Sequence, residues 1–370
     1  MIRLVRARAA RAFAGLAVAT VALGTVVVAP AQAANYVPIS GAGSTWSQNA
    51  IDQWRRDVYQ FGLQVNYAGN GSSDGRNQFR AGTVDFGVSE IPYGTRDGGV
   101  YDPPPTQSPT NPRPFVYLPI VAGGTSFMYN LRIGGRVVTN LQLSQQTIVD
   151  IFTNKIKRWN DPKIKADNAD AKLPAKDIAV IYRTDGSGTT AVFTDYLGKV
   201  SPEWKEKVGV GKVVNWPTGL GAKGNEGVTG QVKTTPYTIG YIERAYASQN
   251  KLPMAELKNK AGKFVAPSIE AMSAAADAVE MPEELFVSLS NADGEAVYPI
   301  TSYSYLLVYE NAKDATKGEA LAKYIWWGLH EGQKFSKDLD YAPIPSKVLA
   351  KVEVRLKELR SGDKKLLSGA

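Results

Sequence analysis

The fold of this chain is decided by the stretch Ile178-Ala-Val-Ile-Tyr-Arg183-Thr-Asp-Gly-Ser187-Gly-Thr189-Thr-Ala-Val-Phe-Thr-Asp-Tyr-Leu197. Its first residues form a short apolar run rich in β-branched side chains, which is typical of a buried strand. After a glycine-rich turn, apolar residues recur at helical spacing and predict an amphipathic helix. Such a junction directs free backbone N–H groups and the positive end of the helix dipole to one point. The stretch therefore predicts a turn that can bind an anion.

The polar residues of this turn favour the same chemistry. Arg183, at the end of the strand, offers a planar set of donors suited to an oxyanion, and Asp185 is near enough to orient it. Ser187 and Thr189 can add hydroxyl donors. An ordinary capped turn with a surface arginine is the alternative, and it would be preferred if the pattern occurred once.

The pattern recurs twice before this stretch. A strand-like start runs into a glycine and hydroxyl turn at residues 44–46, and a second strand runs into the turn at residues 72–75. Alternating strands and helices predict an α/β fold with mostly parallel sheets, in which the loops at the carboxyl ends of the strands form the site.

Composition places the chain among ordinary globular proteins. It has 370 residues, of which 44% are hydrophobic and 21% charged, and a formal charge of +8. The first 11 residues contain four arginines, so the 43 basic residues less four leave 39 against 35 acidic ones. This balance and the lack of dense basic runs argue against nucleic acid as a partner.

The N-terminus predicts export. The arginine-rich start is followed by an apolar stretch and by Ala31-Gln-Ala33, a small-x-small cleavage pattern, so residues 1–33 are expected to be a signal peptide. The chain has no cysteine, which leaves no thiol for a lipid anchor. We expect a protein that is periplasmic or freely secreted.

Enzyme motifs are weak in this sequence. Gly71-Ser-Ser-Asp-Gly75 matches the nucleophile-elbow pattern, but His330 is the only histidine and lies among aromatic residues of an expected helix. With one histidine and no cysteine, no metal site and no cofactor are expected. The sequence indicates oxyanion binding, not catalysis.

Two further regions have distinct compositions. Residues 94–114 are dense in Pro, Gly and Asn and predict a surface loop. After an expected helix over residues 314–329, the chain is expected to end in a polar, basic tail.

Successive motifs of the chain resemble those of one family, the phosphate-binding proteins of the Pst ABC phosphate importer. The resemblance covers residues 39–355 and rests on GAGSTW (41–46), VNYAGNGSS (65–73), TVDFGVS (83–89), RTDGSGT (183–189), WPTGLGAKGN (216–225), IGYIERAY (239–246), YPIT (298–301) and DLDYA (338–342).

The resemblance implies a two-lobed periplasmic-binding-protein fold of type II with the ligand in the cleft between the lobes. Lobe one is then expected to comprise residues 34–120 and 297–370, and lobe two residues 121–296. Monomers are the expectation for this fold.

The resemblance also implies the ligands of a bound phosphate. They are Thr45, the backbone N–H of Trp46, Ser72, Glu90, Arg183, Ser187, Gly188 and Thr189, with Asp185 orienting Arg183. Apart from Glu90, they coincide with the turns identified above from the residues alone.

Two positions depart from the family pattern. Trp46 replaces a phenylalanine, to which a backbone donor is insensitive, and Glu90 replaces an aspartate. The acid is expected to accept a hydrogen bond from protonated phosphate and to repel sulfate, which brings no hydrogen. Glu90 keeps this acceptor but reaches one methylene further. As an alternative, Glu90 is a carboxylate at the rim of the site.

The sequence thus predicts an extracytoplasmic, non-enzymatic receptor that binds inorganic phosphate and delivers it to the permease of an ABC importer. Alternatives are a receptor for sulfate or molybdate, a phosphate scavenger or interaction protein that uses the 94–114 loop, and a hydrolase that uses Ser73 or Ser187.

Overall fold

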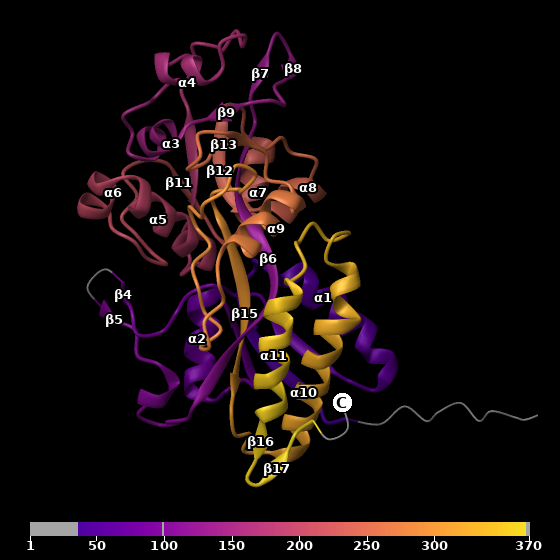
Figure 1. The fold of residues 1–370 in the computed structure, drawn as a ribbon. Coiled ribbons are helices and arrows are strands. Elements are labelled where there is room, and N and C mark those ends of the chain that lie inside the picture. Colours follow the sequence, from indigo (N-terminus) through magenta and orange to yellow (C-terminus); the bar gives the residue numbers. More distant parts are fainter. Residues whose placement is uncertain (1–35, 98–99, 368–370) are drawn as a thin grey trace, which may run out of the picture. The chain divides into compact units, whose positions relative to one another are not determined.

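The computed structural model describes residues 36–97 and 100–367, and the expected signal peptide lies outside them. Residues 34–370 form one compact unit. Among the described residues, an eight-stranded sheet runs in the order β11-β10-β12-β6-β15-β3-β1-β2 (Figure 1). Its strands are β1 (Ile39–Gly43), β2 (Val65–Ala68), β3 (Phe86–Ser89), β6 (Phe115–Tyr129), β10 (Ala179–Arg183), β11 (Leu220–Ala222), β12 (Thr238–Glu243) and β15 (Thr301–Tyr309).

The outer parts of this sheet are parallel, and its centre is antiparallel. Strand β1 pairs in parallel with β2 and β3, and β10 pairs in parallel with β11 and β12. Between these groups, β6 and β15 run antiparallel to each other and to their outer neighbours β12 and β3. The alternating pattern of the sequence predicted the parallel groups, whereas the antiparallel centre comes from strands that are distant in sequence.

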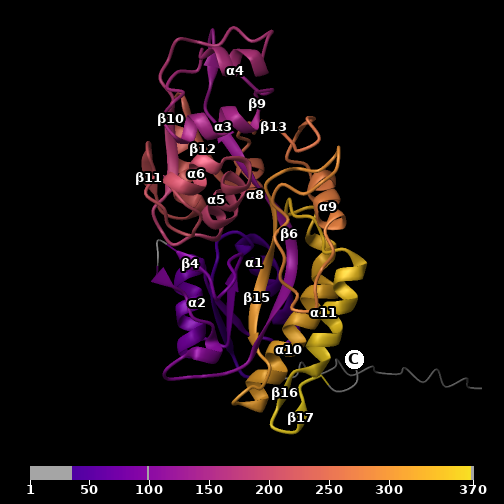
Figure 2. The same cartoon turned by 60° about the vertical axis from the view of Figure 1, so that its left-hand side comes forward.

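Helices cover both parallel groups. Those of the β1 group are α1 (Gln48–Val58), α2 (Ser72–Ala81), α10 (Ala315–His330) and α11 (Ser346–Glu358). Those that follow β6 are α3 (Gln145–Phe152), α4 (Pro162–Asp167), α5 (Gly188–Val200), α6 (Pro202–Lys207), α7 (Gly224–Thr234), α8 (Arg244–Gln249) and α9 (Ile269–Ala278). Figure 2 shows β6 and β15 running from the part of the molecule that contains α2 towards the part that contains α5.

The remaining strands are short. They are β4 (Arg96–Asp97), β5 (Val100–Tyr101), β7 (Arg132–Ile133), β8 (Arg136–Val137), β9 (Gln142–Leu143), β13 (Glu256–Lys258), β14 (Phe264–Val265), β16 (Arg360–Ser361) and β17 (Lys364–Lys365). Three-residue to four-residue 3₁₀ turns lie at Tyr59–Phe61, Pro105–Gln107 and Gly332–Phe335.

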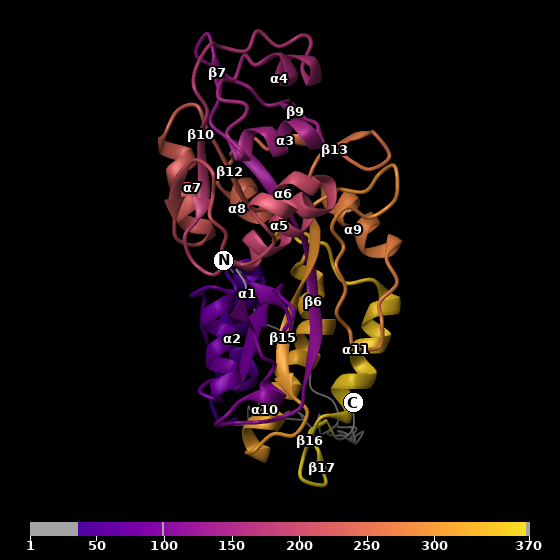
Figure 3. The same ribbon diagram turned by 90° about the vertical axis from the view of Figure 1, so that its left-hand side faces the viewer.

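The end of the chain corrects one expectation. In place of a polar tail, residues 346–358 form helix α11, which lies beside α10 (Figure 3). Val348, Val352 and Leu356 recur every four residues and are buried. The basic residues between them occupy the other face, and they conceal this apolar stripe when the stretch is judged by composition.

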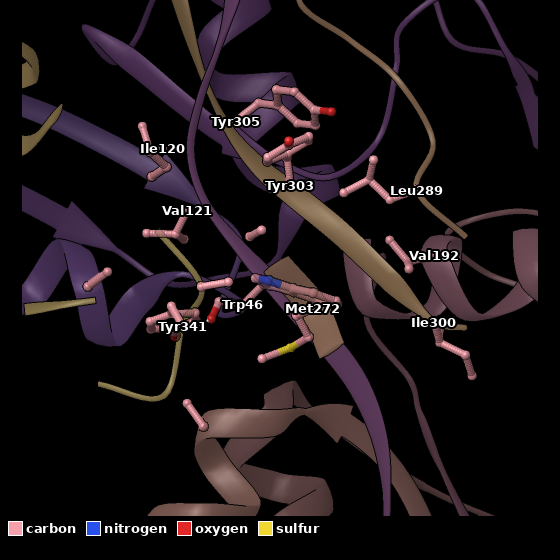
Figure 4. Packing of buried hydrophobic residues seen from close by; sticks show 14 of the residues in the cluster. Trp46, Ile120, Val121, Val192, Met272, Leu289, Ile300, Tyr303, Tyr305 and Tyr341 are labelled. Atoms are coloured by element: carbon pink, nitrogen blue, oxygen red, sulfur yellow. Dashed lines mark hydrogen bonds between the residues drawn. The ribbon is translucent and has the colours of Figure 1, made fainter. Parts of the chain in front are cut away.

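The first helix follows its sequence pattern closely. Ala50, Ile51, Trp54 and Val58 form its buried face. Gly62 ends the following 3₁₀ turn with a positive φ of 80°, which glycine adopts without strain. Trp46, just before the helix, belongs to the main hydrophobic core together with Met272 and Tyr341 (Figure 4).

Candidate functional site

Two groups of loops meet where the parallel strands end. We call the turns that follow β1, β2 and β3 the first wall, and the turn between β10 and α5 the second wall. The first wall carries Ser44, Thr45, Ser72 and Glu90, and the second wall carries Arg183, Asp185, Ser187, Gly188 and Thr189. All these residues except Asp185 are buried.

Direct hydrogen bonds join the two walls. The Gly188 N–H donates to Ser72 Oγ over 3.0 Å, and the Ser73 N–H donates to the Gly186 carbonyl over 3.0 Å. A Cβ atom on Gly188 would lie 1.8 Å from Glu90 Oε2, so only glycine fits at this contact. The structure therefore brings the turns identified in the sequence into one place.

Asp185 fixes the guanidinium of Arg183. Arg183 Nε donates to Asp185 Oδ1 over 2.7 Å, and Nη2 donates to Oδ2, so the planar group is held by two parallel bonds. The N–H of Gly224 also donates to Asp185 Oδ1 over 3.0 Å. Burial alone would raise the pKa of Asp185, but the hydrogen bonds and charge of Arg183 outweigh it and lower this pKa. The carboxylate therefore stays ionised and orients the arginine, as the sequence predicted for this pair.

Several hydroxyls of the site are set to donate. Thr45 Oγ1 accepts from Asn225 Nδ2 over 2.9 Å, Thr189 Oγ1 accepts from Arg183 Nη1 over 3.2 Å, and Ser187 Oγ accepts from the Thr190 N–H over 3.1 Å. Each partner is an N–H group, which cannot accept a hydrogen in return. No acceptor within residues 36–97 and 100–367 takes the hydroxyl hydrogens of these residues, so the hydrogens are available to an added acceptor.

Two expected backbone donors are engaged inside the protein. The Trp46 N–H donates to Ser44 Oγ over 3.0 Å, and the Gly188 N–H donates to Ser72 Oγ. The Trp46 carbonyl accepts from the hydroxyl of Tyr341 over 2.6 Å, which anchors this turn to the C-terminal part of the chain. An anion that bound these N–H groups would have to replace the serine oxygens.

Glu90 lies at the centre of the first wall. It is 4% exposed and its carboxylate accepts from the hydroxyls of Ser44, Ser72 and Ser304 over 2.7, 3.1 and 2.6 Å. Burial raises the pKa of Glu90, while these hydrogen bonds lower it and offset part of the rise. Glu90 is thus a buried carboxylate within the site and not a rim residue.

Sequence reasoning did not single out four residues that support the site. Ser44 and Ser304 bind Glu90, Asn225 binds Thr45, and the Tyr246 hydroxyl donates to the Thr45 carbonyl over 2.6 Å. Asn225 and Tyr246 end two of the family motifs, so those motifs contained a usable signal. Ser304 had none, because only the pairing of β15 with β3 brings it to Glu90.

The proline-rich loop is tied to both walls through Asp102. Its carboxylate contacts Arg76 of α2 over 2.6 Å, Arg80 over 3.2 Å, and Lys212 over 3.2 Å. The backbone of Lys212 in turn accepts from the Ser187 N–H over 3.0 Å. The loop is therefore anchored beside the site.

A cavity of about 310 Å³ borders Glu90. Its lining includes Ile91 from the first wall, Val192 from α5, and Phe286 from the segment before β15. Ser302 of β15 completes the side opposite α5. The cavity therefore adjoins the first wall at Glu90, and Arg183, Ser187 and Thr189 are not part of its lining.

His330, the histidine considered for catalysis, is engaged in hydrogen bonds at the end of α10. The His330 ring binds the Trp326 carbonyl over 2.8 Å and Glu353 over 3.1 Å, so both its nitrogens are engaged at the end of α10.

Across the part of the chain that the structure describes, no cluster of His, Cys, Asp and Glu could hold a metal ion. In the same residues, no helix combines the length and apolar character needed to span a membrane.

Known proteins with similar sequences show the superfamily and the family of this chain. Residues 28–327 match the model of the PBP superfamily domain, so the chain is a member of this superfamily. A phosphate-binding protein PstS from Pasteurella multocida is 41% identical over 334 residues, which cover 89% of this chain and 93% of that protein. PstS from Haemophilus influenzae is 39% identical over 342 residues, 90% of this chain and 96% of that protein. The chain therefore belongs to the PstS family of phosphate-binding proteins.

Solved structures show the same fold at lower identity. A high-affinity periplasmic phosphate-binding protein (PfluDING) bound with phosphate has a TM-score of 0.68 at 20% identity and covers 86% of this chain and 93% of its own. A phosphate-binding protein from Stenotrophomonas maltophilia has a TM-score of 0.61 at 17% identity and covers 87% and 94%. The two-lobed type II fold expected from the resemblance is confirmed.

Proposed function

We propose that this protein is an extracytoplasmic receptor that binds inorganic phosphate with high affinity and delivers it to an ABC importer. The observation that carries the proposal is the set of buried hydroxyls beside Arg183 whose hydrogens remain available, those of Thr45, Ser187 and Thr189. Buried donors without an acceptor are unfavourable unless a ligand supplies one. An oxyanion supplies several acceptors at once.

In this proposal each wall has its own role. Arg183 contributes the positive charge and a fork of donors, and the first turn of α5 contributes N–H groups and hydroxyls. Thr45 donates to the ion from the first wall, and the Trp46 N–H and Ser72 would turn to the ion from Ser44 and Glu90. Glu90, still held by Ser44 and Ser304, accepts the hydrogen of protonated phosphate. Burial of all these groups strengthens each interaction, because little water competes for the donors.

The paired strands β6 and β15 support the proposed division into lobes. We propose that lobe one comprises residues 34–120 and 297–370 and lobe two residues 121–296, with the chain crossing between them within β6 and again just before β15. Rotation about this connection would separate the walls and admit phosphate. We further propose that residues 1–33 are removed on export, which places a monomeric receptor in the periplasm or outside the cell.

Names of the relatives support a binding protein in preference to an enzyme, since curated relatives are named phosphate-binding proteins. The engaged ring nitrogens of His330 point the same way, because neither serves as a base for Ser73 or Ser187.

Isothermal titration of the mature protein tests the proposal. The protein is freed of ligand by partial unfolding, refolded, and titrated with phosphate, sulfate and molybdate in turn. Tight binding of phosphate with no heat from the other ions is expected. Preferential binding of sulfate or molybdate would favour the alternative oxyanion receptor, and no heat with any ion would refute the proposal.

Transport coupling needs a separate test. Cells that lack this chain are expected to lose high-affinity phosphate uptake and to regain it when the intact chain is returned. If uptake is unaffected while the purified protein binds phosphate, the protein is a scavenger that is not coupled to the importer.

A further inference from the structure

The carboxylate of Glu90 is enclosed by hydroxyls from three separate elements. We call Ser44, Ser72 and Ser304 the serine cage. Ser44 follows β1, Ser72 begins α2, and Ser304 lies in β15. Ser44 and Ser72 donate to Oε2, and Ser304 donates to Oε1, so both carboxylate oxygens are engaged.

The direction of these bonds is set by the partners of the serines. Ser44 Oγ accepts from the Trp46 N–H, and Ser72 Oγ accepts from the Gly188 N–H, each over 3.0 Å. A backbone N–H can only donate, so the hydroxyl hydrogen of each serine is directed to Glu90. Chains of this kind polarise one another, which strengthens the final bond to the carboxylate.

The pairing of β15 with β6 is irregular beside Ser304. Ser304 pairs with Val121 and Tyr305 with Pro119, so Ile120 is an extra residue on the opposing strand. A bulge of this kind redirects side chains and is common beside functional sites. On its other edge β15 pairs with β3, where Tyr305 lies opposite Ser89, the residue before Glu90. The hydroxyl of Ser47, 2.8 Å from Ser304 Oγ, completes the chain of hydroxyls.

A carboxylate that already receives these hydrogens is an acceptor. It binds favourably to an oxyanion that brings a hydrogen, as both protonated forms of phosphate do, and it repels sulfate, which brings none. Without the serine cage, a buried Glu90 would take up a proton more readily and could then donate to any oxyanion.

We propose that Ser44 and Ser304, which lie outside the expected ligand set, are positioning residues that hold Glu90 as an acceptor and thereby select protonated oxyanions. This inference rests on the proposed function, because it concerns selectivity at the same site. It also explains how the chain uses glutamate where its family is expected to have aspartate: the longer side chain is held at both oxygens.

The surroundings of Glu90 permit a clean measurement of pH dependence. Tyr67, Tyr305 and Tyr341 face it from β2, from β15 and from the segment before α11, and burial raises the pKa of each phenol. These phenols therefore stay neutral throughout the pH range of the test. Arg183 faces the site from the second wall, and Asp195 and Lys212, which line the adjoining cavity, are paired with Lys199 and Asp102.

The test uses Ser304→Ala and Ser44→Ala, with affinities for phosphate and for sulfate measured by titration calorimetry between pH 5 and pH 8.5. Each variant is expected to raise the lower pH limit of phosphate binding by about one unit and to increase sulfate affinity at pH 5 by about tenfold, because one pKa unit is a tenfold change in protonation. Ser304→Thr keeps the hydroxyl and is expected to restore the normal limit.

Ser361→Ala is the matched control, because the Ser361 hydroxyl donates to the Ala312 backbone carbonyl instead of Glu90 and lies outside the cavity beside it. Circular dichroism confirms that each variant is folded, and Ser44→Ala serves if Ser304→Ala does not fold. An unchanged pH limit in folded variants, or a loss of phosphate affinity that is equal at every pH, would overturn the inference. No phosphate binding by the unaltered protein would instead refute the proposed function.

Discussion

The first wall and the second wall are both strand–turn–helix junctions, yet they present opposite chemistry to the space between them. The second wall holds Arg183 against Asp185 and directs the N-terminus of α5 inward. The first wall holds Glu90 inside the serine cage. One wall therefore offers positive charge and donors, and the other offers a buried acceptor.

The comparison separates affinity from selectivity. Any oxyanion gains from the donors of the second wall, since sulfate and phosphate present similar oxygen atoms. Only an ion that carries a hydrogen gains from Glu90. The two walls can therefore be altered independently, and the following variants should show which property each controls.

Loss of the Arg183 guanidinium should have the largest effect. Arg183→Met is expected to weaken phosphate binding by at least about 100-fold, because a charged hydrogen-bonding partner is removed from a buried site. Arg183→Lys keeps the charge without the fork and should lose less. Calorimetry gives both values, with Arg158→Lys on the surface as control. Retained phosphate binding in Arg183→Met would exclude Arg183 as a ligand.

A side chain at Gly188 should disrupt the contact between the two walls. Gly188→Ala places a Cβ atom within 1.8 Å of Glu90 Oε2 and 2.6 Å of Ser72 Oγ. We expect phosphate affinity to fall by roughly tenfold or more, since such overpacking costs about 1–3 kcal/mol. Gly230→Ala, on α7 and with open space around its Cα, is the control. Unchanged affinity would mean that the walls bind phosphate without approaching this closely.

The ion pairs of Asp102 should affect two different properties, the free energy of unfolding and the rate of phosphate release. Asp102→Ala leaves the buried Arg76 without its carboxylate partner and is expected to lower the free energy of unfolding by about 3 kcal/mol. Lys212→Ala breaks the ion pair between the loop and the segment that holds the Ser187 N–H, and it should change stability by less than about 1 kcal/mol while speeding phosphate release. Urea unfolding and stopped-flow release measure the two effects. Equal stability losses would contradict this division.

The smallest expected effect concerns a second buried glutamate, Glu243, and the pH dependence of stability. Glu243 of β12 is fully buried; its Oε2 accepts from the Ala245 N–H, while its Oε1 lacks a partner among the described residues. Burial raises the pKa of Glu243 well above its usual value, so the folded state holds the proton more tightly than the unfolded state. Its contribution to stability is full below the unfolded pKa and is lost as pH rises through the folded pKa.

Glu243→Gln mimics the protonated form at every pH. The variant and the original protein should be about equally stable near pH 4, and the variant should be more stable by about 1 kcal/mol or more at pH 8. Thermal unfolding across this range measures the difference, with Glu206→Gln on the exposed face of α6 as control. A stability difference between the two proteins that stays constant at all pH values would show that Glu243 does not titrate. That result would contradict the expectation that a buried carboxylate without a serine cage takes up a proton.

Sequence reasoning predicted most of the second wall because its parts are neighbours in the chain. Arg183, Asp185, Ser187 and Thr189 lie within seven positions, and a strand followed by a glycine turn and a helix fixes their geometry locally. The helix of residues 346–358 was missed for the opposite reason. Its apolar stripe has a partner only when α10 and β6 pack against it, and its composition is basic.

The sequence by itself determined the α/β class, the turns that we propose bind an anion, and the family. Only the tertiary structure decided the surroundings of Glu90, because its partner Ser304 is 214 residues away and is brought to it by the pairing of β15 with β3. Local residue order sets backbone geometry over a few residues. The protonation of a buried carboxylate depends instead on every group that packs around it, and those groups meet only in the folded chain.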